Sequence, residues 1–388
     1  MKPVAFIILD GAADSGSQTP LSSAKKPNTD FLASRGFCGL WRGAVAPKSY
    51  NPKSMSDVAT LELLGYSYAD NPGRGYLEAL GLGMKPNANA VYLRGNFATA
   101  KRSEKGMEII DRRAGRDETG LDILAKKLCM KIGSVRVTCI HSVGHRCVVM
   151  LEGKGLGKDI SDADTGMLMK TISARKGSEK TARILNEFSA RAFEILDNDS
   201  INKKRKLPAN YILLRGASKA KSVQQFSKKF HFRACSISGV GIIWGISRFL
   251  GIDVIKPAGA TGRMDTDLKA KLSAAKKALK KYDFVILHIN GCDEAGHDMN
   301  FEAKKEFIEK IDRQVIAAIR KMNARVVVSS DHQTSVISGT HQFGPVPFLI
   351  YSPDKNLSNG INSLSESSCA KGEISENLMS ALKKKLGY

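Results

Sequence analysis

The chain has 388 residues and a formal net charge of +22, with 42% hydrophobic and 25% charged residues. This length and composition suit a globular protein with two domains, or one domain with a large insertion. They exclude a membrane span, because no run of about 18 apolar residues occurs. The seven cysteines include no C-x-x-C pair, and no signal-peptide pattern opens the chain, so we expect reduced thiols and a cytoplasmic location.

The positive charge leaves a nucleic-acid-binding function open as a remote alternative. The lysines, however, are spread along amphipathic helical stretches such as residues 271–282, and no basic motif interleaved with aromatic residues occurs. We therefore interpret the charge as solvated helix faces. Neither a nucleic-acid partner nor a membrane partner is expected.

Short apolar runs alternate with helical patterns at both ends of the chain. Strands are predicted at residues 4–9, 284–289, 325–330 and 347–352, and a helix near residues 28–36. A second helix is predicted over residues 300–322, where apolar residues keep helical spacing at Ile308, Ile311, Val315, Ile319 and Met322. The alternation is typical of β-α-β units, so we expect an α/β fold with a mostly parallel central sheet flanked by helices.

The middle of the chain has a different pattern. Strand-like, alternating pieces occur at residues 91–99, 134–143 and 146–153, and a helix is predicted around residues 180–196. Residues 209–217 then look like a return to a core strand. We therefore expect a smaller α+β domain at residues 86–206, inserted into a core formed by residues 1–85 and 207–388.

Acidic and histidine residues follow the predicted core strands. Asp10 ends the first strand, Asp293 and His297 follow the strand at residues 284–289, and Asp331-His332 follow the strand at residues 325–330. Because ligands bind at the carboxyl ends of parallel strands, these side chains are expected to meet at one edge, together with His341. A single Asp there is more often a turn former, but three Asp and three His suffice for two divalent ions, which would relieve the repulsion between the carboxylates.

A two-metal site is typical of in-line displacement at phosphorus, and Ser56 is the candidate nucleophile. It stands where an irregular loop meets the apolar-periodic stretch of residues 57–66. The alternative is that Ser56 is only a helix N-cap. The two roles are compatible, since a helix N-terminus offers backbone N–H groups to a phosphate.

Six motifs together resemble one enzyme family over nearly the full chain and in the same order. They are SMSDVATLELLGY, NPGRGYLEALGLGM, RGNFAT, DRRAGR, CDEAGHD and SDHQT followed by THQFGPVP. The chain resembles the archaeal-type 2,3-bisphosphoglycerate-independent phosphoglycerate mutases of the alkaline phosphatase superfamily. Thr60 stands where this family often has His.

The resemblance implies interconversion of 3-phosphoglycerate and 2-phosphoglycerate through a phosphoserine on Ser56, with an alkaline-phosphatase-like core. It implies two divalent ions, Mn²⁺, Zn²⁺, Co²⁺ or Mg²⁺, and no 2,3-bisphosphoglycerate. One ion would be held by Asp10, Ser56, Asp331 and His332, and the other by Asp293, His297 and His341. The alternative is another metal-dependent phosphomutase or a phosphomonoesterase of the same superfamily, acting on a small phosphorylated substrate.

The inserted domain is predicted to hold the glycerate moiety. Arginine suits carboxylate and phosphate because its planar fork binds them bidentately, although any one of these arginines could be an ordinary surface residue. The candidate substrate-binding residues are Arg94, Asn96, Arg112, Arg113, Arg116, His145, Arg146 and, at the expected domain junction, Arg215. Asp111 is the candidate proton carrier for the glycerate hydroxyls; its alternative role is to pair with an arginine.

Overall fold

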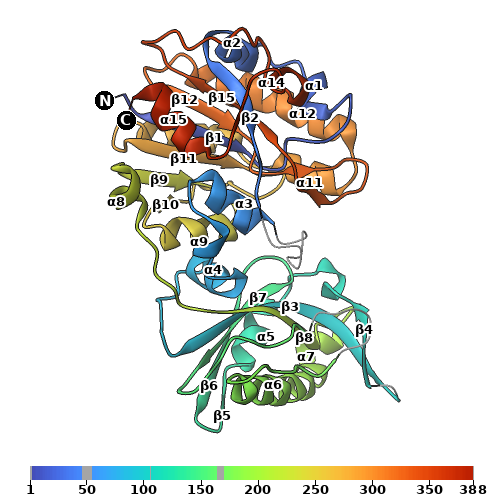
Figure 1. Ribbon diagram of the computed structural model, residues 1–388. Helices are drawn as coiled ribbons and strands as arrows, with labels where there is room; N and C mark the ends of the chain where they lie inside the picture. The colour runs from blue at the N-terminus through green and yellow to red at the C-terminus, as the bar shows by residue number, and fades with distance from the viewer. Residues whose placement is uncertain (1, 46–54, 105, 164–169, 388) are drawn as a thin grey trace. The chain divides into compact units, whose positions relative to one another are not determined.

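The computed structural model describes residues 2–45, 55–104, 106–163 and 170–387. The chain forms two compact units (Figure 1). The first unit comprises residues 1–71 and 223–388, and the second unit comprises residues 72–222.

An eight-stranded sheet forms the centre of the first unit, with the order β10-β9-β11-β1-β12-β15-β2-β16. β1 pairs in parallel with both β11 and β12, β11 pairs in parallel with β9, and only β15 runs antiparallel to its neighbours. The expected mostly parallel sheet is confirmed. Its strands are β1 (Val4–Leu9), β2 (Phe37–Trp41), β9 (Ala234–Ile237), β10 (Asp253–Ile255), β11 (Phe284–Ile289), β12 (Arg325–Ser329), β15 (Val346–Tyr351) and β16 (Glu373–Ser375).

Both faces of the central strands are covered by apolar side chains. On one face Ile7 of β1 belongs to a buried cluster with Phe307 and Ile311. On the other face the ring of Phe6 packs edge-on against Phe284, with 5.7 Å between ring centroids. All six residues of β1 and of β11 are buried, as expected for strands that lie between two helical layers.

The predicted helix over residues 300–322 is present as three consecutive segments. These are α12 (Phe301–Ile311), the π-helical turn Asp312–Ile316 and α13 (Ala317–Ile319). The side chain of Asn300 caps the first segment by accepting a hydrogen bond from the Ala303 N–H. The other helices of this unit are α1 (Pro20–Ser23), α2 (Pro27–Arg35), α3 (Ser56–Leu63), α8 (Phe226–Phe230), α9 (Gly241–Phe249), α10 (Leu268–Ala278), α11 (Gly291–His297), α14 (Glu366–Cys369) and α15 (Leu378–Leu386).

The second unit has its own antiparallel sheet, ordered β4-β3-β7-β6-β5, with β8 pairing with β3. α6, whose apolar residues include Leu185 and Phe188, contributes to a separate buried cluster in this unit. Its strands are β3 (Ala90–Ser103), β4 (Gly106–Asp111), β5 (Met130–Ile132), β6 (Val135–His141), β7 (Arg146–Glu152) and β8 (Tyr211–Lys219), and its helices are α4 (Arg74–Gly81), α5 (Leu121–Lys127), α6 (Glu179–Asp197) and α7 (Ser200–Lys203). No helix among the described residues is long and apolar enough to cross a membrane.

The inserted unit is longer at both ends than the sequence indicated, 72–222 instead of 86–206. β8, which was expected to rejoin the core sheet, instead pairs antiparallel with β3 along most of its length. α4 packs closely on the same two strands: a Cβ atom at Gly75 would lie 2.3 Å from the Tyr92 carbonyl oxygen of β3. The backbone N–H of Tyr76 also donates to Ser218 Oγ of β8. Arg215 therefore lies inside the sheet of the second unit.

Candidate active site

The carboxyl ends of β1 and β12 bring Asp10, Asp331 and His332 together. Because the two strands pair in parallel, their ends lie at the same edge of the sheet. His332 Nε2 lies 3.2 Å from Asp10 Oδ1 and 3.6 Å from Asp331 Oδ2. All three side chains are buried, and one ligand atom from each lies within 4.8 Å of the others.

A second group joins Asp293 of α11 to His332 and His341, again with ligand atoms within 4.8 Å of one another. His341 belongs to the short antiparallel pair β13 (Gln333–Thr334) and β14 (His341–Gln342), which folds the chain back toward Asp331. His341 Nε2 lies 3.2 Å from Asp293 Oδ1. His332 is common to both groups, so the two groups are adjacent.

His297 stands beside the second group without belonging to it. Its Nε2 lies 3.5 Å from Asp293 Oδ2, one helical turn away on α11. Its Nδ1 lies 2.8 Å from the carbonyl oxygen of Gly339. Since a carbonyl only accepts hydrogen bonds, Nδ1 carries a proton, which leaves Nε2, toward Asp293, as the nitrogen that could bind a cation.

The donor set fits divalent cations. Asp10 Oδ1 and His332 Nε2 are buried and make no hydrogen bond with any described residue, so both atoms could become ligands of a cation, which would displace a proton from His332. Burial and the charge of Asp10 raise the pKa of Asp331 to about 7. Burial lowers the pKa of His332, but the charges of Asp331 and Asp10 outweigh it and raise that pKa to about 10. A cation would relieve the repulsion between these carboxylates.

Ser56 is the first residue of α3, and the structure does not make it an N-cap. The cap position is occupied by Met55, which makes no side-chain cap hydrogen bond. Residues four apart on a helix are neighbours on one face, and the residue four positions after Ser56 is Thr60. Its Oγ1 lies 3.5 Å from Asp331 Oδ2, so Ser56 lies on the face of α3 that looks toward the first group. Ser54, the single motif residue before Met55, lies outside the described part of the chain.

Sequence reasoning missed His288, which is completely buried within β11. Its Nε2 lies 3.3 Å from Asp10 Oδ2. Burial raises the pKa of Asp10, but the close imidazoles of His288 and His332 outweigh that effect, so the net shift is downward. A histidine in an otherwise apolar strand was the available signal for this contact.

In the second unit, strand register gathers several of the predicted substrate residues on one face of the sheet. Asn96 of β3 stands opposite Arg146 of β7, and Arg94 of β3 stands opposite Arg215 of β8. Positions two apart in a strand share a face. Burial and the charges of Arg146 and Arg113 lower the pKa of the neighbouring His145 to about 3, so this imidazole is neutral at physiological pH.

Glu78, which the sequence reasoning missed, balances part of this positive charge. Its Oε1 lies 3.0 Å from Arg74 Nε and 3.6 Å from Arg94 Nη1. Burial raises the pKa of Glu78, but the charges of Arg94 and Arg74 outweigh it and hold the pKa at about 2. Glu78 and Arg74 are spaced four apart on α4, a pattern that predicts an ion pair on a helix but not its arginine partners on β3.

The loop after β4 carries three further arginines, Arg112, Arg113 and Arg116, all of them exposed. Asp111 Oδ1 accepts hydrogen bonds from the backbone N–H groups of Arg113 and Gly115, at 2.8 and 2.9 Å. The hydrogen bond from Gly115 is the main reason why the pKa of Asp111 is lowered. These bonds show that Asp111 organises the arginine-bearing loop through its backbone; its role as proton carrier and its pairing with an arginine side chain both stay predictions.

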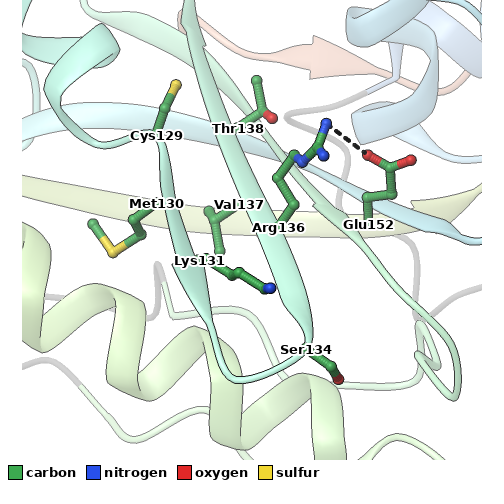
Figure 2. Close-up of a pocket in the computed structure, with 8 residues that line it drawn as sticks. All are labelled: Cys129, Met130, Lys131, Ser134, Arg136, Val137, Thr138 and Glu152. Atoms are coloured by element: carbon green, nitrogen blue, oxygen red, sulfur yellow. Dashed lines mark ion pairs between the residues drawn. The ribbon is translucent and has the colours of Figure 1, made fainter.

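A cavity of about 540 Å³ lies elsewhere in the second unit, along β5, β6 and the end of β7 (Figure 2). It is lined in part by Lys131, Arg136 and Glu152, and Figure 2 shows the ion pair between the last two. None of the predicted site residues lines it. The cavity is therefore separate from the candidate site.

Comparison with known proteins agrees with this geometry. Residues 2–382 match the family model of the metalloenzyme superfamily. A 2,3-bisphosphoglycerate-independent phosphoglycerate mutase of Archaeoglobus fulgidus is 37% identical over 96% of this chain and 94% of its own. The solved structure of a cofactor-independent phosphoglycerate mutase from Thermoplasma acidophilum matches 99% of both chains with a TM-score of 0.69 and 29% identity. The PH0037 protein of Pyrococcus horikoshii matches with a TM-score of 0.82 and 27% identity, covering 100% of this chain and 97% of its own. This chain belongs to the metalloenzyme superfamily and, within it, to the family of 2,3-bisphosphoglycerate-independent phosphoglycerate mutases.

Proposed function

We propose that this protein interconverts 3-phosphoglycerate and 2-phosphoglycerate with divalent metal and without 2,3-bisphosphoglycerate. The observation that carries the proposal is the position of Ser56, one helical turn from Thr60, which contacts Asp331 of the first ligand group. A nucleophilic hydroxyl next to a cluster of unsatisfied metal-type ligands is what phosphoryl transfer requires.

Two cations would be held by the residues predicted from the sequence. Asp10, Ser56, Asp331 and His332 would hold one, and Asp293, His297 and His341 the other; His332 also belongs to the second group. When bound, the cations supply positive charge to the phosphoryl oxygens and to the serine oxygen. The mixture of carboxylate and imidazole ligands suits Mn²⁺, Zn²⁺, Co²⁺ or Mg²⁺.

Ser56 is the proposed carrier of the phosphoryl group. Its Oγ loses a proton and bonds to phosphorus, while the bond between phosphorus and the glycerate oxygen breaks and that oxygen takes up a proton. The reverse step, with the other glycerate hydroxyl as the attacking group, gives the positional isomer. The N-terminus of α3 offers backbone N–H groups to the phosphoryl oxygens.

The arginine-rich face of the second unit is the proposed holder of glycerate during this exchange. Arg94, Asn96, Arg146 and Arg215 share one face of its sheet, and three more arginines follow β4. Glycerate carries a carboxylate, which arginine forks bind well. Glycerate held in this way competes with bulk water for the phosphoserine, because a held nucleophile reacts at a high effective concentration.

The second candidate function, hydrolysis by a phosphomonoesterase, would use the same metal ligands and the same serine. Product identity separates the two. Full-length protein, stripped of metal and reloaded with Mn²⁺, is incubated with 3-phosphoglycerate and no bisphosphoglycerate, and products are followed by ³¹P NMR. We expect 2-phosphoglycerate, no stimulation by added bisphosphoglycerate, and loss of turnover on chelation. Inorganic phosphate as the main product would favour the phosphatase.

The same preparation tests the metal ligands. His297→Ala should lower both turnover and bound metal, because Nε2 of His297 is turned toward Asp293. His231→Asn removes an exposed histidine at the end of α8 and is the matched control. Unchanged metal content in His297→Ala would remove His297 from the ligand set.

A further inference from the structure

Thr334 contacts residues of the candidate metal centre. Its side chain is completely buried in β13. Its Oγ1 lies 2.7 Å from Asp293 Oδ1 and 3.2 Å from His332 Nδ1. One hydroxyl thus contacts Asp293 of the second group and His332, which belongs to both groups.

The position of Thr334 is fixed by its surroundings. Its backbone N–H donates to the Ala13 carbonyl oxygen at 3.1 Å, and its own carbonyl oxygen accepts from the buried Lys304 Nζ at 2.7 Å. Two glycines make room for the side chain: a Cβ atom at Gly11 would lie 2.5 Å from Thr334 Oγ1, and one at Gly296 would lie 2.7 Å from Cγ2. The hydroxyl is therefore held in place by backbone contacts and packing.

The direction of the two hydrogen bonds follows from donor counting. A hydroxyl has one proton, and an ionised carboxylate, the form in which Asp293 would bind a cation, can only accept. The short contact to Asp293 therefore takes the Thr334 proton. An oxygen lone pair is left facing His332 Nδ1, which must then be the donor. The carbonyl oxygen of Gln333, 3.3 Å from the same Nδ1, also only accepts and requires the same direction.

We propose that Thr334 is a positioning residue for both metal sites: it accepts from His332 Nδ1 and donates to Asp293, so that Nε2 of His332 keeps its lone pair for a cation. A metal-binding histidine usually donates its other N–H to a fixed acceptor, which sets the tautomer and the ring orientation. A single hydroxyl between the two groups would also make their metal affinities depend on each other. The inference rests on the proposed function, since it requires that divalent ions bind these residues.

The tautomer can be measured without any substitution of Thr334. The full-length protein, labelled with ¹⁵N-histidine, is loaded with Zn²⁺, and long-range ¹H–¹⁵N correlations are recorded. His332→Gln identifies the His332 signals by their loss. We expect His332 to carry its proton on Nδ1 and to bind metal through Nε2. A proton on Nε2, or metal on Nδ1, overturns the proposal.

Two variants distinguish the effect of the Thr334 hydroxyl from the effect of its packing. Thr334→Val keeps the shape and removes the hydroxyl, and Thr334→Ser keeps the hydroxyl and removes the methyl group. Calorimetric titration of the metal-stripped proteins with Mn²⁺ should show about 10- to 100-fold weaker binding for the Val variant, the usual effect of losing such a supporting contact. The Ser variant should bind close to the level of the unmutated protein.

These measurements distinguish a failure of the proposed role of Thr334 from a failure of the proposed mutase function. Equal Mn²⁺ affinity of the Val variant and the unmutated protein overturns the role of Thr334 and leaves the mutase proposal intact. Loss of affinity in the Ser variant equal to that in the Val variant also overturns it, because packing would then explain both. Absence of Mn²⁺ binding in the unmutated protein overturns the proposed function and this inference together.

Discussion

The imidazole Nε2 of His288 lies 3.3 Å from Asp10 Oδ2, and both side chains are buried at the ends of adjacent parallel strands. The other ring nitrogen, Nδ1, lies 3.4 Å from the hydroxyl of Ser238, which follows β9. Three neighbouring strands thus contribute one residue each to a row of contacting side chains, Ser238, His288 and Asp10. His288 is thus the residue of this row that contacts the Asp10 carboxylate.

Replacing His288 should therefore weaken metal binding although His288 is not proposed as a ligand. We expect His288→Leu to lower the affinity for Mn²⁺ by about 10- to 100-fold, because the Asp10 carboxylate loses the contact that orients it. His231→Asn is the matched control, since His231 is exposed and has a left-handed backbone that Asn tolerates. Calorimetric titration gives the Mn²⁺ affinities. An unchanged affinity in His288→Leu would show that the contact of His288 with Asp10 does not support metal binding.

Ser56→Ala should abolish isomerisation while the fold persists. The structure gives Ser56 no capping role, since Met55 occupies the cap position, so the stability cost should be below the ~1 kcal/mol of a lost N-cap. Ser67→Ala is the control: the Ser67 side chain does cap a helical turn, through a reciprocal arrangement with Asp70, and should lower stability slightly while leaving turnover unchanged. Thermal unfolding measures the stability of both variants, and the ³¹P NMR assay measures their turnover. Near-normal turnover in Ser56→Ala would show that water, and not Ser56, is the nucleophile.

Glu78→Gln tests the charge balance of the arginine-rich face. The pKa of Glu78 is held at about 2, below its usual 4.5, by Arg94 and Arg74 against the effect of burial. The ionised carboxylate therefore stabilises the fold above the unfolded-state pKa, and this stabilisation is lost as the pH falls through the folded-state value. The stability difference between wild type and Glu78→Gln should shrink by about 2 kcal/mol between about pH 6 and about pH 3.

Urea unfolding followed by circular dichroism measures this difference. Glu118→Gln, at an exposed position of the same unit, controls for the general effect of removing one negative charge. A difference that stays constant over this pH range would show that Glu78 is not stabilised by its arginine neighbours.

The first ligand group could be predicted from the sequence because parallel strands align their ends. Asp10 follows its apolar run directly, Asp331 and His332 come two serines after theirs, and the sheet then brings the three together. His288 and Thr334 could not be found in this way. Their contacts depend on strand register and on a short hairpin, which local periodicity does not specify.

For β8, the sequence likewise predicts the strand but not the sheet in which it pairs. The apolar run of residues 211–214 correctly predicts a strand, but such a run is equally compatible with the central sheet and with the sheet of the second unit. The pairing with β3 is a tertiary choice, supported by the packing of α4 on both strands. Arg74 and Glu78 were missed for the same reason, because residues 1–85 were all placed in the core.

Substitutions in the loop after β4 should separate isomerisation from hydrolysis. Arg112, Arg113 and Arg116 are exposed, so their replacement should not unfold the second unit. Their charges nevertheless reach the buried part of the arginine-rich face: Arg113 and Arg116 contribute to the lowered pKa of His145, and Arg112 to that of Arg215. The loop therefore belongs to the same positive surface as the arginines of the sheet.

Replacing these three arginines with Gln should lower isomerisation by at least about 100-fold, because each charged hydrogen bond lost to the glycerate carboxylate is worth about 1.5–3 kcal/mol. Hydrolysis of a small activated phosphate ester should fall much less, because the attacking water comes from bulk solvent and does not have to be bound by these arginines. The ratio of hydrolysis to isomerisation should therefore rise. The matched control replaces Lys126, Lys131 and Lys158, three exposed lysines of the same unit, and so removes the same charge. Both activities are measured on protein with verified metal content. If they fell equally in the arginine variant, or if the lysine variant changed the ratio as much, glycerate would be held elsewhere.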